Sequence, residues 1–319
     1  MLGTAPTRLT TIDYYPVIPY PITDYSTVVE TLRYAEEAGK EVGQEYHFVT
    51  YDLGVCLKAY PLIFNHPVRY KKHVVLIGTF HIVCAYMKML AKKMKGSGFS
   101  DILIESGLMT SGSMVSVLSG KGYSRAMNCH KSLLEGLERL LMMKLFLLED
   151  DMELKVERAK QQVLIHKTKP NADIKTLVSH EDISSLISRF VEFRQKVKNG
   201  LLGVSARMWL SYMDHVWLIL SLLHAVKTNN YLEYAHCMTL LPDLFFSFGG
   251  QNYARYLTYF GVFLANIDHS HPGALDLIKQ GVFSVARSYV PGSRSATDKT
   301  IEETFMKHSK SRGGNGGQE

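Results

Sequence analysis

Acidic side chains near the two ends of the chain have the types and spacing needed for metal-assisted cleavage of a phosphodiester bond. Asp52 ends the β-rich run HFVTYD, while Asp298 and Glu302 lie four residues apart, so a helix would present both on one face. Two-metal cleavage needs about three acids that converge on ions ~4 Å apart. The sequence therefore predicts a Mg²⁺ or Mn²⁺ site formed by Asp52 and Glu302, with Asp101 or Glu105 as the third acid.

The same acids also have an interpretation as helix caps. Asp52 precedes a helix expected from about Val55, and Asp298 lies at the start of the last expected helix. A carboxylate at a helix N-terminus accepts hydrogen bonds from the first free N–H groups. Acids between a strand and a helix are common for this reason alone, so both interpretations stay open at this stage.

Other chemistries find less support in the sequence. His81 and Cys84 have the spacing of one helical face, but Cys129 and His130 are adjacent, and adjacent side chains on a helix diverge by about 100°. Buried cysteines and hydrogen-bonded histidines are therefore favoured over a zinc site. The sequence has neither a G-x-S-x-G elbow nor a GxxxxGK[ST] phosphate loop.

Contact with nucleic acid is compatible with the composition, which gives a formal net charge of +6. In the segment QNYARY, Tyr253, Tyr256 and Tyr259 could stack on bases, although tyrosines at this spacing are also typical of a helix edge that faces the core. The basic residues that we expect to hold a DNA or RNA backbone are Lys92, Lys93, Arg125, Arg255 and Lys310.

Alternating strands and helices near the N-terminus would position the first of these acids. Strands are predicted over residues 47–53, 73–79 and 101–105, because these short runs are apolar and β-branched, with helices over 55–64 and 81–95 between them. This β-α-β-α-β order predicts a small, mostly parallel sheet.

The rest of the chain is predicted to be helical. Leucines recur with helical spacing in an expected long helix over residues 124–163, and further apolar helices are expected over 204–227, 230–241 and 250–267. A short strand over 281–288 and a last helix over 297–310 complete the pattern.

We therefore expect a helix-dominated α/β fold. Its parts are an α/β portion with a proline-rich arm over residues 1–110, a large helical body over 111–280, a terminal strand and helix over 281–310 that pack on the α/β portion, and a disordered tail over 311–319. A ribonuclease-H-like core with a helical insertion would explain this order. Fewer than four strands in the sheet would argue against that arrangement.

Six stretches occur in a fixed order along most of the chain. They are IDYYPVI, VTYDLGVCLKA, GTFHIVCAYMKMLAKKMKGSGFSDILIESG, LSGKGYSRAMNCHKSLLEGLERLL, LLPDLFFSFGGQNYARYLTYF and ATDKTIEETFMKHSKSRGG. Together they resemble an uncharacterised domain family, a domain of unknown function from multicopy, transposon-associated proteins of animals and fungi. The resemblance implies a transposase-derived catalytic domain.

By that resemblance, Asp52 corresponds to the family's strand-end acid and Glu302 to the acid on its terminal helix. His81 corresponds to a histidine after the second strand, and residues 252–255, NYAR, to the most recognisable tetrapeptide. These matches make Asp52, Glu302 and His81 the expected catalytic residues.

The chain also departs from the family pattern. Gly249 and Gly250 stand where the family often has an acid–histidine pair, and Leu53 and Lys299 stand where glutamine is usual. If the missing acid is functional in the family, this copy is degenerate.

Membrane insertion and secretion are not expected. The N-terminus lacks a continuous apolar segment, and the most apolar stretch, residues 216–226, is shorter than the roughly 20 residues that span a bilayer. The four widely spaced cysteines do not suggest disulfides. These features predict an intracellular protein, cytoplasmic or nuclear, with no membrane partner.

Two functions are consistent with these observations. The first is a metal-dependent, nuclease-like domain that acts on DNA or RNA. The alternative is a non-enzymatic scaffold whose helical body binds a partner. The sequence is also compatible with a fragment of a longer element-encoded protein.

Overall fold

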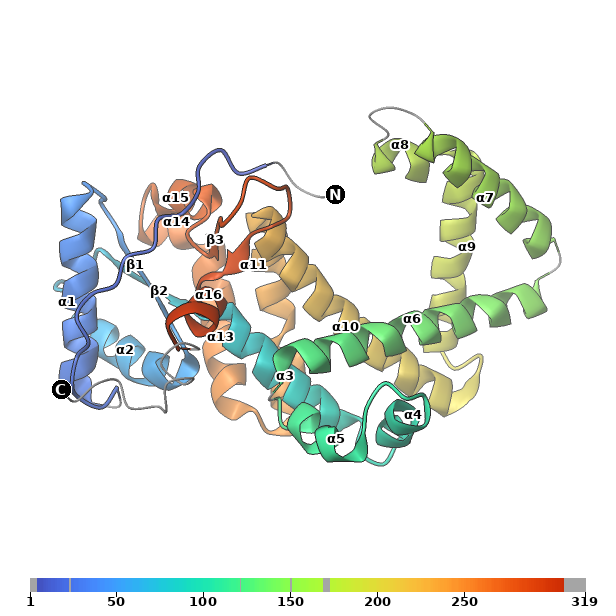
Figure 1. Cartoon of the computed structure of the whole chain (residues 1–319), viewed down its shortest axis with the longest axis horizontal. Coiled ribbons are helices and arrows are strands. Elements are labelled where there is room, and N and C mark those ends of the chain that lie inside the picture. Colours follow the sequence, from blue (N-terminus) through green and yellow to red (C-terminus); the bar gives the residue numbers. More distant parts are fainter. Residues whose placement is uncertain (1–4, 23, 121, 150, 169–172, 307–319) are drawn as a thin grey trace. The chain divides into compact units, whose positions relative to one another are not determined.

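The computed structural model describes residues 5–22, 24–120, 122–149, 151–168 and 173–306 (Figure 1). Contacts divide the chain into two compact units, each considered by itself. We call them the sheet unit, which contains Leu2–Lys93, Leu118–Lys121 and Leu218–Glu319, and the helical unit, which contains Met94–Val117 and Gly122–Trp217.

The sheet unit contains both described sheets and most of the short helices. Its elements are α1 (Tyr25–Glu41), β1 (His47–Tyr51), α2 (Leu53–Asn65), β2 (His73–Ile77), α3 (Thr79–Lys93), α11 (Tyr231–Leu240), α12 (Pro242–Phe248), α13 (Gln251–Ala265), α14 (Ile267–Ser270), α15 (Ala274–Gln280), β3 (Ser284–Val285), β4 (Ser295–Ala296), α16 (Thr297–Ile301) and the π-helix η1 (Glu302–Met306).

A parallel pair of strands forms the frame for the site. β1 pairs with β2 in a register that places His47 beside His73 and Tyr51 beside Ile77, and α2 is the helix that connects them. Every residue of β2 is buried, which explains why its sequence is continuously apolar after His73. The two strands therefore end at the same edge of the sheet, where α2 and α3 begin.

Large apolar side chains form the core of the sheet unit around α3. Tyr86 is fully buried on this helix and meets Phe245 of α12 edge to face, with 5.6 Å between ring centroids. α12 in turn packs on α13, where Leu257 and Phe260 are fully buried. This packing fixes the orientation of α3 and thus of the residues at its N-terminus.

Segments from the two ends of the chain meet in the sheet unit. β3 and β4 form a short antiparallel pair, and the Thr10 N–H donates to the Ala286 carbonyl at 2.8 Å. α16 follows β4 and packs against α3 and β1. The expected helix over 297–310 is thus an α-helical turn followed by a π-helix, and residues 307–319, including the expected tail, lie outside the described part.

The helical unit contains only helices among the residues that the structure describes. They are α4 (Phe99–Glu105), α5 (Ser111–Leu118), α6 (Tyr123–Leu148), α7 (Met152–Lys167), α8 (Ile174–Val178), α9 (Glu181–Lys198) and the part of α10 (Gly203–Thr228) up to Trp217. The long helix expected over 124–163 is therefore two helices, separated near Asp151, whose φ of 67° is left-handed.

The third predicted strand is wrong, because residues 101–105 belong to α4. Phe99 and Leu103, one helical turn apart, are buried, whereas Ile102 and Ile104 are exposed. A short apolar run fits a strand and a buried helix equally well by pattern alone. Here the helical spacing of the two buried residues decides the structure.

The fold is helix-dominated with a small parallel sheet near the N-terminus, as expected. That sheet has two strands in the described part of the chain, so a ribonuclease-H-like arrangement is not confirmed. Among the described helices, none has both the length and the apolarity needed to cross a membrane.

Candidate functional site

A carboxylate from the end of the chain caps helix α3. Gly78 precedes α3 and has no side chain with which to accept hydrogen bonds from the first turn. Asp298 of α16 takes this role, since its two carboxylate oxygens accept from the backbone N–H groups of Phe80 and His81, each at 3.1 Å. These are the donors that an N-cap residue normally satisfies. A Cβ on Gly78 would collide with this carboxylate, so the glycine leaves the required space.

The same carboxylate also holds the side chain of His81. Asp298 Oδ2 lies 3.0 Å from His81 Nδ1, and the Asp298 side chain is 8% exposed. An ionised carboxylate only accepts hydrogen bonds, so Nδ1 carries the proton and Nε2 has the lone pair of the neutral ring. Glu302 Oε1 lies 3.9 Å from Nε2. His81 is therefore flanked by two acids on opposite sides of its ring.

The electrostatic environment favours protonated His81. The hydrogen bond that His81 donates to Asp298 raises the pKa of His81 above its usual 6.5, against the lowering effect of burial, and the charges of Asp298, Asp52 and Glu302 add to the increase. About a third of the His81 side chain is exposed, at 32%. The ring is thus held by protein groups and open to solvent, and these are the requirements for a general acid–base group. We call Asp52, His81, Asp298 and Glu302 the acid–histidine cluster.

Asp52 lies at the end of β1 and caps α2. Its Oδ1 accepts a hydrogen bond from the Val55 N–H at 2.9 Å, as the capping interpretation predicted. Its charge also contributes to the raised pKa of His81. The residue therefore has a structural role and an electrostatic effect on the cluster.

Two further residues border the cluster. The Tyr253 hydroxyl of α13 donates to the His81 carbonyl at 3.3 Å, which ties the first turn of α13 to α3. Burial, together with the charges of Asp298 and Glu302, raises the pKa of the Cys84 thiol to about 12. At neutral pH, Cys84 is a thiol and not a nucleophilic thiolate.

The expected metal ligands Asp52 and Glu302 both lie near His81, where their charges add to its raised pKa. Within the described ranges, no group of three or more His, Cys, Asp or Glu side chains has metal-binding geometry. The oxygens of Asp298 already accept three hydrogen bonds, and one oxygen of Asp52 is committed to its cap. Asp52 and Asp298 are thus occupied by hydrogen bonds within the protein, and His81 lies between Asp298 and Glu302.

The other acids expected at this site lie elsewhere in the chain. Asp101 and Glu105 are exposed on α4 and belong to the helical unit. They were expected beside Asp52 because a neighbouring strand would carry them, and that strand is a helix.

The predicted nucleic-acid contacts are spread over several elements. Lys92 donates to the Phe248 carbonyl at 3.4 Å and lies about 16 Å along α3 from His81. Lys93 follows it and is half-buried. On α13, the exposed Arg255 lies over the ring of Tyr256, with 4.8 Å from Cζ to the ring centroid.

The remaining two basic residues, Arg125 and Lys310, do not belong to the described elements that carry the cluster. Arg125 belongs to the helical unit, where its guanidinium donates to the Ser113 hydroxyl at 3.1 Å. Lys310 lies outside the described residues.

Comparison with known protein families matches residues 2–318 to the Domain of unknown function (DUF8702). The chain belongs to this family. Neither the curated proteins nor the solved structures gave a match. The description of the DUF8702 family assigns no activity to its members. The association with transposons stays a prediction.

The residue that organises the cluster in this DUF8702 member was not among the expected catalytic residues. Of the two interpretations of Asp298, the one in which it caps its own helix is wrong, because the N-cap of α16 is Ala296 and Asp298 caps α3 instead. A usable signal is Gly78, because a glycine between a buried strand and a helix leaves the helix without a local side-chain cap.

Proposed function

We propose that this protein is a nuclease-like phosphodiesterase of transposase descent, with the acid–histidine cluster as its catalytic centre. One observation carries the proposal: acids from the end of the chain flank His81, which follows β2 near the start. The site lies at the carboxyl ends of parallel strands, the edge at which α/β proteins generally bind ligands. Sequence resemblance supplies the expectation that the substrate is DNA or RNA.

In this proposal, His81 transfers the proton. Its Nε2 lone pair takes a proton from the attacking hydroxyl group, which is water or a ribose 2′-hydroxyl. The nucleophile's oxygen bonds to phosphorus, the bond to the leaving oxygen breaks, and the imidazolium returns the proton to that oxygen. Asp298 keeps the proton on Nδ1 and stabilises the imidazolium, as an acid partner does for a catalytic histidine. Every step in this proposal is carried out by groups of the chain itself.

The test is cleavage of labelled single-stranded DNA and RNA, with either Mg²⁺, Mn²⁺ or a chelator present. We expect His81→Asn to lose about a hundredfold or more of the wild-type rate, the usual contribution of a general acid–base group. Asp298→Asn should lower the rate and shift its pH profile towards acid, because the pKa of His81 falls. Asp276→Asn is the matched control, since this acid is 78% exposed on α15.

Absence of cleavage by the wild type under all three conditions would refute the enzymatic proposal. Cleavage that survives His81→Asn would place the chemistry elsewhere. Cleavage only with Mg²⁺ or Mn²⁺ would contradict the metal-free mechanism. It would favour the metal-dependent mechanism predicted from the sequence, in which Asp52 and Glu302 bind the ion.

A non-enzymatic binding role is the second candidate, favoured by a groove in the helical unit. This cavity of about 200 Å³ lies between α6 and α10 and is lined by Leu137, Leu140, Leu141, Lys144, Leu202, Ala206, Trp209, Leu210 and Met213. Leu140 is 62% exposed there, and an exposed apolar side chain in a groove is typical of a partner site. We expect Leu140→Glu to abolish binding of an apolar helical partner without affecting cleavage.

A further inference from the structure

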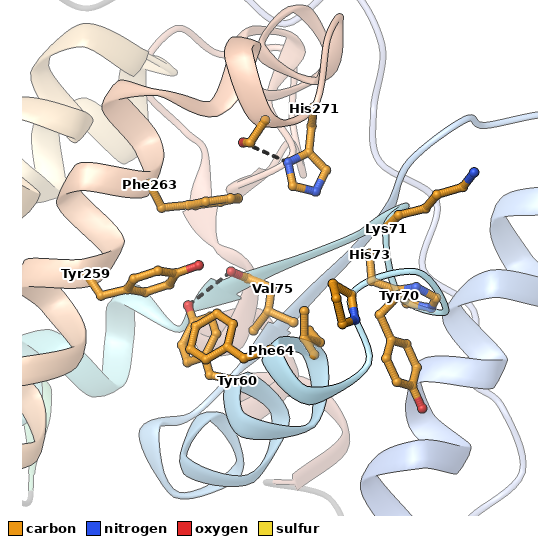
Figure 2. Close-up of a pocket in the computed structure, with 12 residues that line it drawn as sticks. Tyr60, Phe64, Tyr70, Lys71, His73, Val75, Tyr259, Phe263 and His271 are labelled. Carbon is orange, nitrogen blue, oxygen red and sulfur yellow. Dashed lines mark hydrogen bonds between the residues drawn. The ribbon is translucent and has the colours of Figure 1, made fainter.

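An aromatic pocket is lined in part by α13, the helix whose Tyr253 contacts His81. The cavity is about 440 Å³ and is enclosed by α2, β2, α13, α14 and the segment between α2 and β2. Figure 2 shows His271 and Phe263 on one side and Tyr60 and Phe64 of α2 on the other. Its size lies in the range of small-molecule sites.

The rings around this cavity offer both flat and edge-on surfaces. Tyr60 and Phe64 are stacked, with centroids 5.9 Å apart, and Tyr259 meets both edge-on at 5.2 Å. Phe263 is stacked with Tyr259 at 6.1 Å and edge-on to His271 at 5.7 Å. Phe64 and Tyr259 are 50% and 36% exposed, so their ring surfaces are accessible from the cavity. A flat aromatic ligand would add to this stack.

The charge of the pocket indicates an anionic ligand. Lys71 is exposed at the rim, and none of the twelve residues drawn around the cavity is acidic (Figure 2). Burial lowers the pKa values of His73 and His271, so both rings are neutral at physiological pH. A cationic ligand would find ring faces but no carboxylate, whereas a phosphate group would find Lys71.

The position of the pocket relates it to the acid–histidine cluster. Tyr253 of α13 donates to the His81 carbonyl, and Tyr259 lies six residues further along α13, or about 9 Å by helical rise. That value is a rise along the axis of α13; the pocket also includes His73, at the start of β2, whereas His81 follows the end of that strand. A single strand with a base in the pocket would therefore reach His81 only through further nucleotides.

We propose that this pocket binds an unpaired base of a single-stranded nucleic acid, stacked against Tyr259 and Phe64, with Lys71 on a neighbouring phosphate. The inference rests on the proposed function, because it names the substrate of that centre. Stacking on aromatic side chains is how proteins hold single strands with little sequence preference. Duplexes are excluded from this mode, since their bases are already paired and stacked.

The test compares two strands of equal charge and length, oligodeoxythymidylate and its abasic analogue, by fluorescence anisotropy with the full-length His81→Asn protein. We expect the abasic strand to bind about fivefold to a hundredfold more weakly, the range that one or two stacking interactions give. Tyr259→Leu and Phe263→Leu should remove this preference. Lys71→Gln should weaken binding of both strands by a similar factor.

Tyr289→Leu is the matched control, because this tyrosine is 61% exposed in the sheet unit and does not line the pocket. If a leucine variant unfolds, quenching of a 2-aminopurine base on binding to the His81→Asn protein provides a second measurement, and Lys71→Gln a variant at an exposed site. Equal binding of oligodeoxythymidylate and its abasic analogue would overturn the inference. So would 2-aminopurine fluorescence that is not quenched on binding. Base-dependent binding without any cleavage by the wild type would support the pocket while refuting the nuclease.

Discussion

Two histidines in this protein have opposite shifts of pKa because their surroundings differ. The hydrogen bond that His81 donates to Asp298 raises the pKa of His81. Burial lowers the pKa of His130 to about 4, since its partners are the Tyr212 hydroxyl, 2.8 Å from Nδ1, and the stacked ring of Phe99. His81 therefore holds its proton more tightly than a free histidine, whereas His130 is a neutral part of the core.

Acid should destabilise the helical unit through His130. The unfolded chain binds a proton at this residue below pH 6.5, and the folded chain does so only below about 4. Stability is therefore complete above pH 6.5 and falls between these values, by about 3 kcal/mol for this shift. Denaturant unfolding at several pH values checks this, with fluorescence of Trp209 and Trp217, which both lie in the helical unit.

The variant His130→Gln should flatten this pH dependence, while His180→Gln, at an exposed position in the same unit, should leave it unchanged. An equally steep loss of stability in His130→Gln would show that another group causes it.

At the residue scale, sequence analysis selected members of the cluster but missed its centre. Asp52, His81 and Glu302 follow from residue types next to predicted elements, and the two acids both raise the pKa of the His81 imidazole. The capping of α3 by Asp298 depends on a contact 217 positions away in the chain. Local pattern contains no information about such a contact, because only tertiary packing brings the two helices together.

Two neighbouring helices of the sheet unit solve the same capping problem in different ways. α2 has a local cap, Asp52, whereas α3 begins after Gly78 and takes its acceptor from α16. A cap of the second kind also docks the helix that supplies it. The start of α3 and the position of α16 are therefore coupled.

Removing the local cap should destabilise α2 and leave the cap of α3 in place. Asp52→Ala should lower stability by about 1 kcal/mol, while Asp52→Asn retains an acceptor for the Val55 N–H and should cost much less. Amide hydrogen exchange measures the protection of Val55 in both variants. Equal protection of this amide in wild type and Asp52→Ala would rule out the cap as its source.

At the element scale, prediction succeeded at the start of the sheet but did not simply follow the length of the pattern, since the helix expected over 124–163 is two helices. The strands at β1 and β2 and the helix between them were expected from their sequences, and the parallel pairing follows from a helical connection. The prediction of a strand over residues 101–105 was wrong. Five apolar-rich residues do not distinguish a strand from a helix whose buried residues are one turn apart.

At the scale of the whole molecule, the sheet unit is assembled from both ends of the chain, with the helical unit inserted between them in sequence. The acid–histidine cluster forms only when α16 docks on α3. Folding of this site thus requires contacts of high sequence separation, which form at a large cost in chain entropy. The proposed chemistry depends on this docking.

The most direct test of the account is an NMR titration of the His81 imidazole, assigned by its absence in His81→Asn, in wild type and Asp298→Asn. We predict that His81 titrates above pH 6.5 in the wild type, and that its pKa falls in Asp298→Asn, because the neutral amide no longer stabilises the imidazolium. The same His81 pKa in both proteins would contradict the docking of α16 on α3 and the catalytic centre built on it.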